Sequence, residues 1–229
     1  GIEGLQVPTC APADLSELQS RAQAIAGFTL GELADMAGIA IPRDFKRHKG
    51  WTGQLIETWL GATAGSKPQQ DFPELGVELK TLPINQFGQP LETTYVCYAP
   101  LLLPPLITWQ TCNVKNKLQC VLWVPVEGER QIPVAERRIA TPFLWQPNEV
   151  QNALLQQDWE ELTEMIALGK VESITARHGE VMQLRPKAAS GQVLTDALDT
   201  EGNKIQTRPR GFYLRKQFTS LILQTHFRQ

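Results

Sequence analysis

Apolar residues recur at helical spacing in the first part of the chain, in two sets separated by glycine. The first set consists of Leu15, Leu18, Ala22 and Ile25. It predicts a helix near Asp14 to Ala26 that ends at Gly27, because glycine readily adopts the left-handed conformation that terminates helices. A second helix is expected to begin at Thr29, which forms a capping box with Glu32, and to end at Gly38. Both helices are interpreted as core scaffolding.

A third helix is expected after the basic segment RDFKRHKG at residues 43–50, which is typical either of a solvated surface or of a contact with phosphate. Its apolar positions are Leu55, Ile56, Trp59 and Leu60. Glu57 lies in their midst. A carboxylate within an apolar stripe is costly unless it is paired or bound to a metal. Glu57 is therefore a candidate site residue, with exposure at the helix edge as the alternative.

Strict alternation of polar and apolar residues closes the stretch DFPELGVELK, which begins at Asp71. In a strand, successive side chains point to opposite faces, so Glu78 and Lys80 are expected on the same face. Val77 and Leu79 then lie on the opposite, core-facing side. The segment FPELG is long enough to turn the chain back. We therefore expect the carboxylate of Asp71 to approach that of Glu78.

This expected pair of carboxylates suits a divalent metal ion. Two adjacent carboxylates repel each other, which raises the pKa of one or favours a cation between them. Mg2+ accepts one or two carboxylates and keeps several waters, which can serve hydrolysis. Lys80 would orient an attacking water or offset charge on a phosphorane-like transition state. The pattern predicts a metal-dependent nuclease centre, although alone it also fits an exposed strand with an ordinary Glu and Lys.

The middle of the chain is expected to add two buried strands and a long helix. β-Branched and aromatic residues predict the strands at Thr93 to Tyr98 and at Gln119 to Val126. Asn148 caps a helix expected from about Glu149 to Leu168. Its inward positions are Leu154, Leu155, Trp159, Leu162, Met165 and Ile166. Its outer face, which would serve solubility or a partner, is interpreted as acidic through Asp158, Glu160, Glu161 and Glu164.

The last third is expected to fold as strand, turn, strand and helix. The strands are predicted at Val181 to Leu184 and at Pro209 to Leu214, and Gly191 to Asn203 is interpreted as a polar excursion. The terminal helix is marked by Phe218, Leu221, Ile222 and Phe227. This order predicts an α/β fold in which a mixed sheet is flanked by helices. We expect a single domain over residues 1–229 with two lobes and a cleft between them.

Charge is distributed unevenly along a chain that is nearly neutral as a whole. The 229 residues are 42% apolar and 20% charged, with a net charge of −2, which excludes the disordered and fibrous classes. After Glu201 the chain contains no acidic residue. Its basic residues there are Lys204, Arg208, Arg210, Arg215, Lys216 and Arg228. Such asymmetry is typical of a nucleic-acid-binding protein.

The cysteines and the hydropathy of the chain indicate the cellular compartment that we expect. The cysteines are Cys10, Cys97, Cys112 and Cys120. They form no C-x-x-C pair and have no histidine at ligand spacing, so we interpret them as reduced thiols of a cytosolic protein. The longest apolar run is interrupted by Pro104, and no run reaches the length of a membrane span. The sequence also shows no signal-peptide pattern.

The order of these motifs resembles the MutH family of DNA mismatch-repair endonucleases. The basic loop is followed by GWTGQLIETWLGATAGSKPQQDF and LGVELKT. The later motifs are PLETTYVC, KLQCVLWVPVEGER, DWEELTEMI, ITARHGE, RPKA and PRGFYLRK. The resemblance covers nearly the whole chain from about Gly27 to Phe227. This family belongs to the restriction-endonuclease-like superfamily, whose shared feature is an Asp followed by Glu-x-Lys, and it implies that fold, with the two lobes around a DNA-binding cleft.

The resemblance implies a catalytic centre in the N-terminal half and a DNA-reading surface in the C-terminal half. Asp71 and Glu78, with the backbone carbonyl of Leu79, would bind one or two Mg2+ ions, and Lys80 would act on the water. Glu57 and Lys117 would supplement the centre; Lys117 matches a family lysine that lines the active site. The expected DNA contacts are Lys49, Tyr95, Arg185, Pro186, Lys187, Arg210 and Tyr213. For Arg185, Lys187 and Tyr213 the alternative is generic surface charge and one packed tyrosine.

The activity implied is a nick within GATC, on the 5′ side of G, in an unmethylated strand of hemimethylated or unmethylated DNA. Methylation of the adenine N6 removes a donor hydrogen and adds bulk in the major groove, so a close polar contact can reject it. Tyr213 is the leading candidate for that contact. The family also implies activation by MutL, which connects it to MutS, and a monomeric protein in the bacterial cytoplasm, nucleoid-associated when it acts, with no membrane partner.

Other functions fit the same residues. A restriction-type endonuclease that cuts both strands would need a symmetric dimer. A non-catalytic DNA-binding module would use the acidic residues structurally. A small-molecule phosphohydrolase would use the same carboxylates, but it leaves the acid-free basic end of the chain unexplained.

Overall fold

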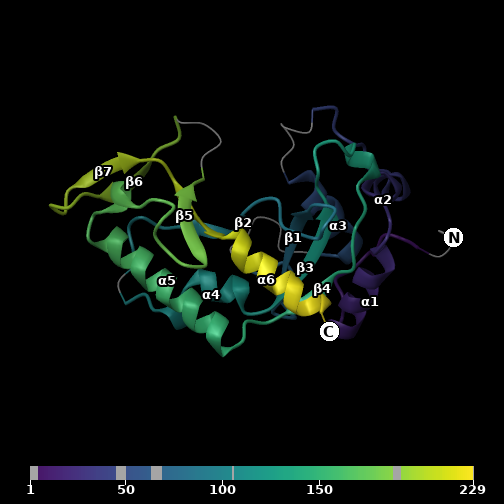
Figure 1. Cartoon of the computed structure of the whole chain (residues 1–229), viewed down its shortest axis with the longest axis horizontal. Coiled ribbons are helices and arrows are strands. Elements are labelled where there is room, and N and C mark those ends of the chain that lie inside the picture. Colours follow the sequence, from purple (N-terminus) through teal and green to yellow (C-terminus); the bar gives the residue numbers. More distant parts are fainter. Residues whose placement is uncertain (1–4, 45–49, 63–68, 105, 188–191, 229) are drawn as a thin grey trace. The chain divides into compact units, whose positions relative to one another are not determined.

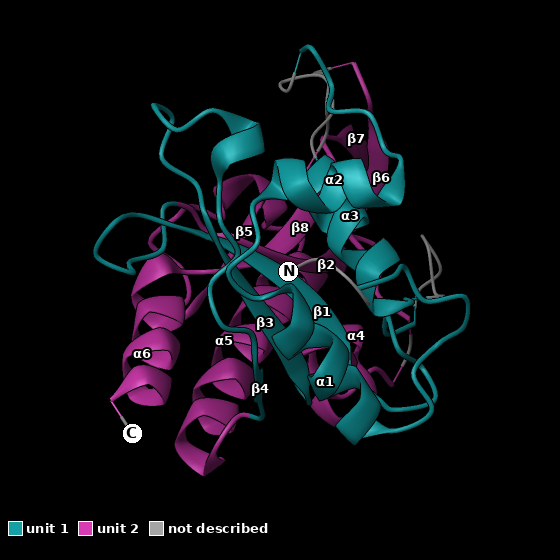
Figure 2. Cartoon of the chain, turned by 90° about the vertical axis from the view of Figure 1, so that its right-hand side faces the viewer, with its two compact units in different colours: residues 1–91, 119–146 teal, residues 92–118, 147–229 magenta. Residues whose placement is uncertain are grey.

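The structure, a computed structural model, describes residues 5–44, 50–62, 69–104, 106–187 and 192–228. The chain divides into two compact units, drawn in different colours in Figure 2. Unit 1 comprises residues 1–91 and 119–146, and unit 2 comprises residues 92–118 and 147–229. Each unit therefore contains two separate stretches of sequence. The expected two lobes around a DNA-binding cleft stay a prediction.

Unit 1 places three helices against a small mixed sheet. The helices are α1 (Leu15–Ile25), α2 (Leu30–Ala37) and α3 (Trp51–Leu60). The strands, in spatial order, are β1 (Glu78–Ile84), β3 (Val121–Glu127) and β4 (Phe143–Trp145). The β1 strand runs parallel to β3, and β4 pairs antiparallel with β3. The mixed α/β composition predicted from the sequence is confirmed, as Figure 1 shows.

Local capping contacts fix the helix ends that the sequence predicted. The Asp14 side chain accepts a 2.8 Å hydrogen bond from the backbone N–H of Glu17 at the start of α1. Thr29 and Glu32 form both hydrogen bonds of the capping box of α2. Gly38, with φ of 68°, ends that helix in the left-handed conformation.

The core of unit 1 lies between these helices and one face of the sheet. Val77 and Leu79 belong to this core, together with Leu122 of the neighbouring strand. Leu79 pairs with Leu122 in the parallel ladder, so both side chains point to the same face. The predicted core-facing side of β1 is confirmed. Glu78 and Lys80 consequently leave the strand on the other face.

Unit 2 contains an antiparallel sheet, a hairpin and a long helix. The sheet has the order β2 (Thr94–Ala99), β8 (Arg210–Leu214) and β5 (Met182–Pro186). The hairpin consists of β6 (Thr195–Leu198) and β7 (Lys204–Thr207). The helices are α4 (Asn113–Leu118), α5 (Glu149–Ala167) and α6 (Lys216–Phe227). The α5 helix contacts both β5 and β6 (Figure 1).

The β6–β7 hairpin corrects the interpretation of Gly191 to Asn203 as a polar excursion. The turn between the two strands is built by Asp199, whose carboxylate accepts hydrogen bonds from the N–H groups of Glu201 and Asn203. Gly202 supplies a φ of 82°. The strands have only four residues each, TDAL and KIQT, and neither contains more than two successive apolar residues, so their pattern did not stand out from that of a loop.

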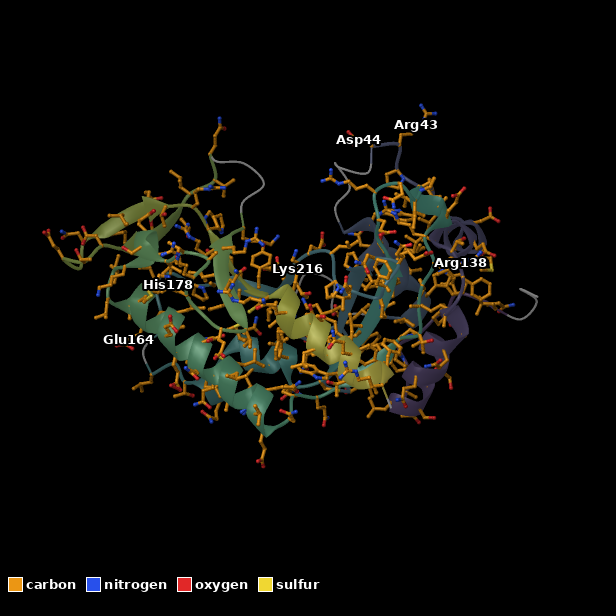
Figure 3. All side chains as sticks on the ribbon, viewed as in Figure 1. Arg43, Asp44, Arg138, Glu164, His178 and Lys216 are labelled. Atoms are coloured by element: carbon orange, nitrogen blue, oxygen red, sulfur yellow. The ribbon has the colours of Figure 1, made fainter. Side chains whose placement is uncertain are left out.

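Asp158 corrects the predicted acidic face of α5. Its side chain is only 1% exposed, whereas Glu160, Glu161 and Glu164 are exposed as expected. Figure 3 shows Glu164 on the outer side of the helix. The Asp158 carboxylate accepts hydrogen bonds from three successive backbone N–H groups that lead into β5, at distances of 2.7 to 2.9 Å. It satisfies buried donors and is not a surface charge.

The predicted positions of the terminal helix are only partly buried. Phe218 and Ile222 are buried, but Leu221 and Phe227 are about half exposed, at 51% and 53%. The four cysteines are free thiols, as predicted. Within the described ranges, no helix is both long and apolar enough to cross a membrane.

Candidate functional site

A tight turn returns Asp71 to the start of β1. Phe72 and Val77 form an isolated antiparallel bridge, with hydrogen bonds of 2.9 and 3.3 Å between their backbones. Gly76 has a φ of 67°, a conformation that side-chain-bearing residues rarely adopt, and completes the turn. The turn expected from the sequence is present, and it holds the Asp71 backbone beside Glu78.

Asp71 and Glu78 are connected by two reciprocal contacts. The backbone N–H of Asp71 donates to Oε1 of Glu78 at 3.1 Å. The Asp71 carboxylate in turn accepts a 2.8 Å hydrogen bond from the backbone N–H of Leu79. Each carboxylate is thus oriented by the other residue's segment of backbone, which fixes both near the first residue of β1.

Lys80 places an ammonium group beside this pair. Its Nζ lies 3.6 Å from Oε2 of Glu78. The exposed fractions of the two side chains are 15% for Lys80 and 4% for Glu78. An ion pair this far from solvent is held in a definite geometry and is less screened than a surface pair. The burial of Glu78 was not foreseen, since alternation alone predicts which face a side chain leaves and not how deeply it is covered.

Glu57 comes to the same region from α3. The carboxyl group is half-buried, and burial is the main cause that raises its pKa. The negative charge of Asp71 raises this pKa further, while the positive charge of Lys80 opposes the rise. Glu57 therefore lies within the electrostatic field of both residues. Three carboxyl groups and one ammonium group gather here, an arrangement that attracts a cation.

The residues present fit a Mg2+ ion, although they do not form a dense acidic cage. Among the described residues, no group of three or more His, Cys, Asp or Glu side chains has the geometry of a metal site. Mg2+ does not require one, because it binds through one or two carboxylates and retains waters. Asp71 and Glu78 supply that number. The Leu79 carbonyl as a further ligand stays a prediction.

Lys117, which was predicted to supplement the centre, belongs to α4 of unit 2 and is half-buried. Its part in catalysis stays a prediction. Lys49 lies outside the described residues.

Four of the predicted DNA contacts lie on the sheet β2–β8–β5 of unit 2 or directly beside it. Tyr95 and Tyr213 are paired across β2 and β8, with ring centroids 5.4 Å apart. The Arg185 guanidinium lies 5.3 Å from the centre of the Tyr213 ring. The Lys187 ammonium lies 4.6 Å from the centre of the Tyr95 ring. We call these four residues the cation–aromatic array; both distances are typical of cation–π contacts.

Burial further disfavours ionisation of the phenol groups of this array. Burial raises the pKa of Tyr95 to about 12. It also raises the pKa of Tyr213, against the opposing charge of Arg185. Both hydroxyl groups therefore remain potential hydrogen-bond donors at physiological pH. Arg185, Pro186 and Lys187 are exposed.

Arg210 is placed differently from the other predicted DNA contacts. The side chain is 11% exposed, and its guanidinium lies 3.8 Å from a carboxylate oxygen of Glu172. It also donates to the carbonyl of Arg208 and, at 3.4 Å, to the hydroxyl of Thr207. Burial lowers the pKa of Arg210, and Glu172 opposes that effect. These contacts give Arg210 a packing role, and its contact with DNA stays a prediction.

Thr93 contacts the cation–aromatic array, and nothing in the sequence indicated this contact. Its hydroxyl accepts a 2.7 Å hydrogen bond from Nη1 of Arg185, which is 92 positions away in the chain. No local spacing connects residues so far apart. Only the pairing of β2 and β5 with opposite edges of β8 brings them together.

The chain is similar to DNA mismatch repair proteins over almost its whole length. A family model described as "DNA mismatch repair enzyme MutH" matches residues 60–158. The DNA mismatch repair protein MutH of Yersinia enterocolitica is 59% identical over 221 residues, which cover 96% of this chain and 97% of the relative. The MutH proteins of Salmonella paratyphi B and Salmonella newport are each 59% identical over 216 residues, or 94% of both chains. The region matched by the family model contains Asp71, Glu78 and Lys80.

Proposed function

Because this chain belongs to the MutH family of DNA mismatch repair enzymes, we propose that it is a Mg2+-dependent endonuclease that nicks one strand of double-stranded DNA. In the narrower form of the proposal, it acts within GATC, on the 5′ side of G, in a strand whose adenine is unmethylated. The observation that carries the proposal is the mutual contact of Asp71, Glu78 and Lys80 at the start of β1. The restriction-endonuclease-like fold belongs to the same proposal and is supported by the mixed sheet of unit 1.

The carboxylates of Asp71 and Glu78 are the residues that would hold the metal, with the Leu79 carbonyl beside them. A bound Mg2+ would supply an activated water and offset negative charge on the phosphate. The two carboxylates are already oriented by backbone N–H groups, so little reorganisation is needed when a cation binds. Their cross-contacts support the assignment of both as ligands.

Lys80 and Glu57 are suited to the proton and charge movements of hydrolysis. When a water oxygen bonds to phosphorus and one P–O ester bond breaks, charge builds on the phosphoryl oxygens and the water must lose a proton. The Lys80 ammonium, 3.6 Å from Glu78, would orient the water and offset that charge. Burial raises the pKa of Glu57, so this group takes up a proton more readily than an exposed glutamate.

The cation–aromatic array is the proposed reading surface. Arg and Lys side chains contact guanine in the major groove more often than other residues do. Arg185 and Lys187 lie on an exposed part of β5 and beyond its end, and each covers a tyrosine ring. The neutral Tyr213 hydroxyl is the candidate that senses the adenine N6 edge. Lys49 and Pro186 would add contacts to this surface or to the DNA backbone.

Control of the activity by a partner is part of the proposal. An enzyme that cut every GATC freely would be hazardous, so activation by MutL, which reports mismatch detection by MutS, suits this function. The exposed acidic residues of α5 and the exposed part of α6 are two surfaces that such control could use. We also propose that the protein acts as a monomer on DNA in the bacterial cytoplasm.

The proposed function is tested by a nicking assay on GATC duplexes that are unmethylated, hemimethylated or fully methylated, with each strand labelled separately. With Mg2+ we expect nicks in unmethylated strands only, accelerated by MutL and abolished by EDTA. The native mass of the DNA complex should correspond to one chain per site. Cleavage of both strands by two chains would favour a restriction-type enzyme, and binding without any Mg2+-dependent nick would favour a DNA-binding module.

A further inference from the structure

The Arg185 side chain is held at two points although it is exposed. One guanidinium nitrogen donates to the hydroxyl of Thr93 at 2.7 Å, and the guanidinium carbon lies 5.3 Å from the centre of the Tyr213 ring. A free arginine samples many rotamers, and fixing it costs entropy whenever it binds a ligand. The Thr93 hydroxyl and the Tyr213 ring already restrict the Arg185 side chain in the absence of DNA, which reduces the entropy lost on binding.

Gly211 determines where the Tyr95 ring can lie. It occupies β8 between Arg185 of β5 and Tyr98 of β2 in the register of the sheet. A Cβ atom at this glycine would lie 2.8 Å from Cε2 of Tyr95 and 3.3 Å from Cε2 of Tyr213. The first distance is too short for two carbon atoms, so any side chain here would displace the Tyr95 ring.

A β-bulge contributes to the same arrangement. The pairing of β2 with β8 shifts register between Tyr95 and Cys97, which pair with Tyr213 and Phe212 of β8. Bulges re-aim side chains in this way, frequently next to functional sites. The Tyr95 ring lies against Gly211, a strand position that has no side chain. The Lys187 ammonium lies 4.6 Å from the centre of that ring, so this cation–π contact depends on the position of the ring.

The geometry points to Thr93 and Gly211 as positioning residues of the DNA-reading surface: the Thr93 hydroxyl fixes the Arg185 guanidinium against Tyr213, and Gly211 makes room for the Tyr95 ring beneath Lys187. This inference rests on the proposed function. Thr93 and Gly211 would contact residues of the cation–aromatic array and would not contact the DNA bases. Readout by arginine requires two hydrogen bonds in one plane, so a displaced guanidinium loses sequence discrimination before it loses attraction to phosphate.

Thr93 is tested with a matched pair of variants, Thr93→Val and Thr93→Ser. The readout is the ratio of affinities for a GATC duplex and for a duplex of scrambled sequence, measured by fluorescence anisotropy in EDTA. We expect Thr93→Val to lower the affinity for GATC by about tenfold, since a hydrogen bond to a charged group is lost, and to leave the scrambled duplex almost unaffected. Thr93→Ser should restore the ratio, because it keeps the hydroxyl. The control Thr225→Val alters an exposed threonine of α6 and should bind as the wild type does.

Gly211→Ala should lower the same ratio, because the added methyl group would displace the Tyr95 ring that lies beneath Lys187. Circular dichroism identifies a variant that fails to fold, and the Thr93 pair then decides alone. If Thr93→Val keeps the wild-type ratio, or if Thr93→Ser is as impaired as Thr93→Val, the inference is wrong, yet wild-type nicking of GATC would leave the proposed function intact. If the wild type itself shows no preference for GATC, both are overturned.

Discussion

Glu57 shows how the surroundings of one residue create a pH dependence. Its pKa is raised from 4.5 by burial, and further by the charge of Asp71. The folded protein therefore prefers the neutral carboxyl group more strongly than the unfolded chain does. The stabilising contribution is fully present below pH 4.5 and is lost as the pH rises from there through the raised pKa.

We expect Glu57→Gln to remove this dependence. The variant and the wild type should have similar stability at low pH, and the wild type should fall behind as the pH rises above 4.5. Urea denaturation at a series of pH values without divalent ions measures the difference. A wild type that gains stability relative to the glutamine variant over this range would show that the carboxyl group is not in an environment that disfavours its charge.

Tyr213 is the residue on which methyl discrimination is proposed to depend. Tyr213→Phe keeps the ring that lies against Arg185 but removes the hydroxyl. We expect unmethylated GATC to be nicked within about threefold of the wild-type rate, whereas discrimination against the methylated strand should fall by roughly tenfold, the effect of one lost polar contact. Competition between differently labelled duplexes measures both. Unchanged discrimination would remove Tyr213 from this role.

Residues close together in sequence were the ones whose contacts could be predicted. Asp71 and Glu78 are seven positions apart, and alternation together with a short turn sufficed to bring them together. Thr93 and Arg185 are separated by most of unit 2, and neither residue has a distinctive neighbour in the sequence. The family resemblance named Arg185 as a reader, but the hydroxyl that holds it became visible only in the folded sheet.

Among the elements, α5 stabilises β5 through one buried carboxylate. Asp158 accepts hydrogen bonds from the N–H groups of Glu180, Val181 and Met182, the segment that enters β5. Arg215 also donates to the carbonyls of His178 and Gly179, just before this segment. The strand that carries Arg185 is thus fixed at its beginning by two charged side chains.

We expect Asp158→Asn to destabilise the protein by about 2 to 4 kcal/mol, because an amide has a single acceptor oxygen and would turn a donor toward buried N–H groups. The matched control is Glu161→Gln on the exposed side of the same helix, which should change the stability by less than about 0.5 kcal/mol. Urea unfolding provides both values. Equal effects of the two substitutions would contradict the structural role of Asp158.

The sequence predicted those elements whose position is determined by local residues, such as helix caps and β-branched runs. It missed features that depend on contacts between distant segments. Capping residues fixed the ends of α1 and α2, and β-branched runs indicated β2 and β3. The β6–β7 hairpin lacks an apolar stripe, so its alternation was mistaken for a loop. Asp158 was assigned to the acidic face of α5 because a helical pattern does not reveal that a neighbouring strand needs an acceptor.

At the scale of the whole molecule, the residues proposed for chemistry and those proposed for recognition belong to different units. The carboxylates and Lys80 are supplied by unit 1, while the cation–aromatic array is supplied by unit 2. A nuclease organised in this way can lose cleavage without losing DNA binding, and the reverse. The net charge of −2 hides this division, because the acid-free basic segment after Glu201 lies entirely in unit 2.

The most direct test of the nuclease centre is the single-turnover nicking rate of Lys80→Ala on an unmethylated GATC duplex with Mg2+. We expect a loss of at least about a hundredfold, the usual effect of removing one group that stabilises a developing charge, with DNA affinity nearly unchanged. The control Lys170→Ala removes an exposed lysine of unit 2 and should nick as the wild type does. A Lys80→Ala variant that nicks at the wild-type rate would contradict the account.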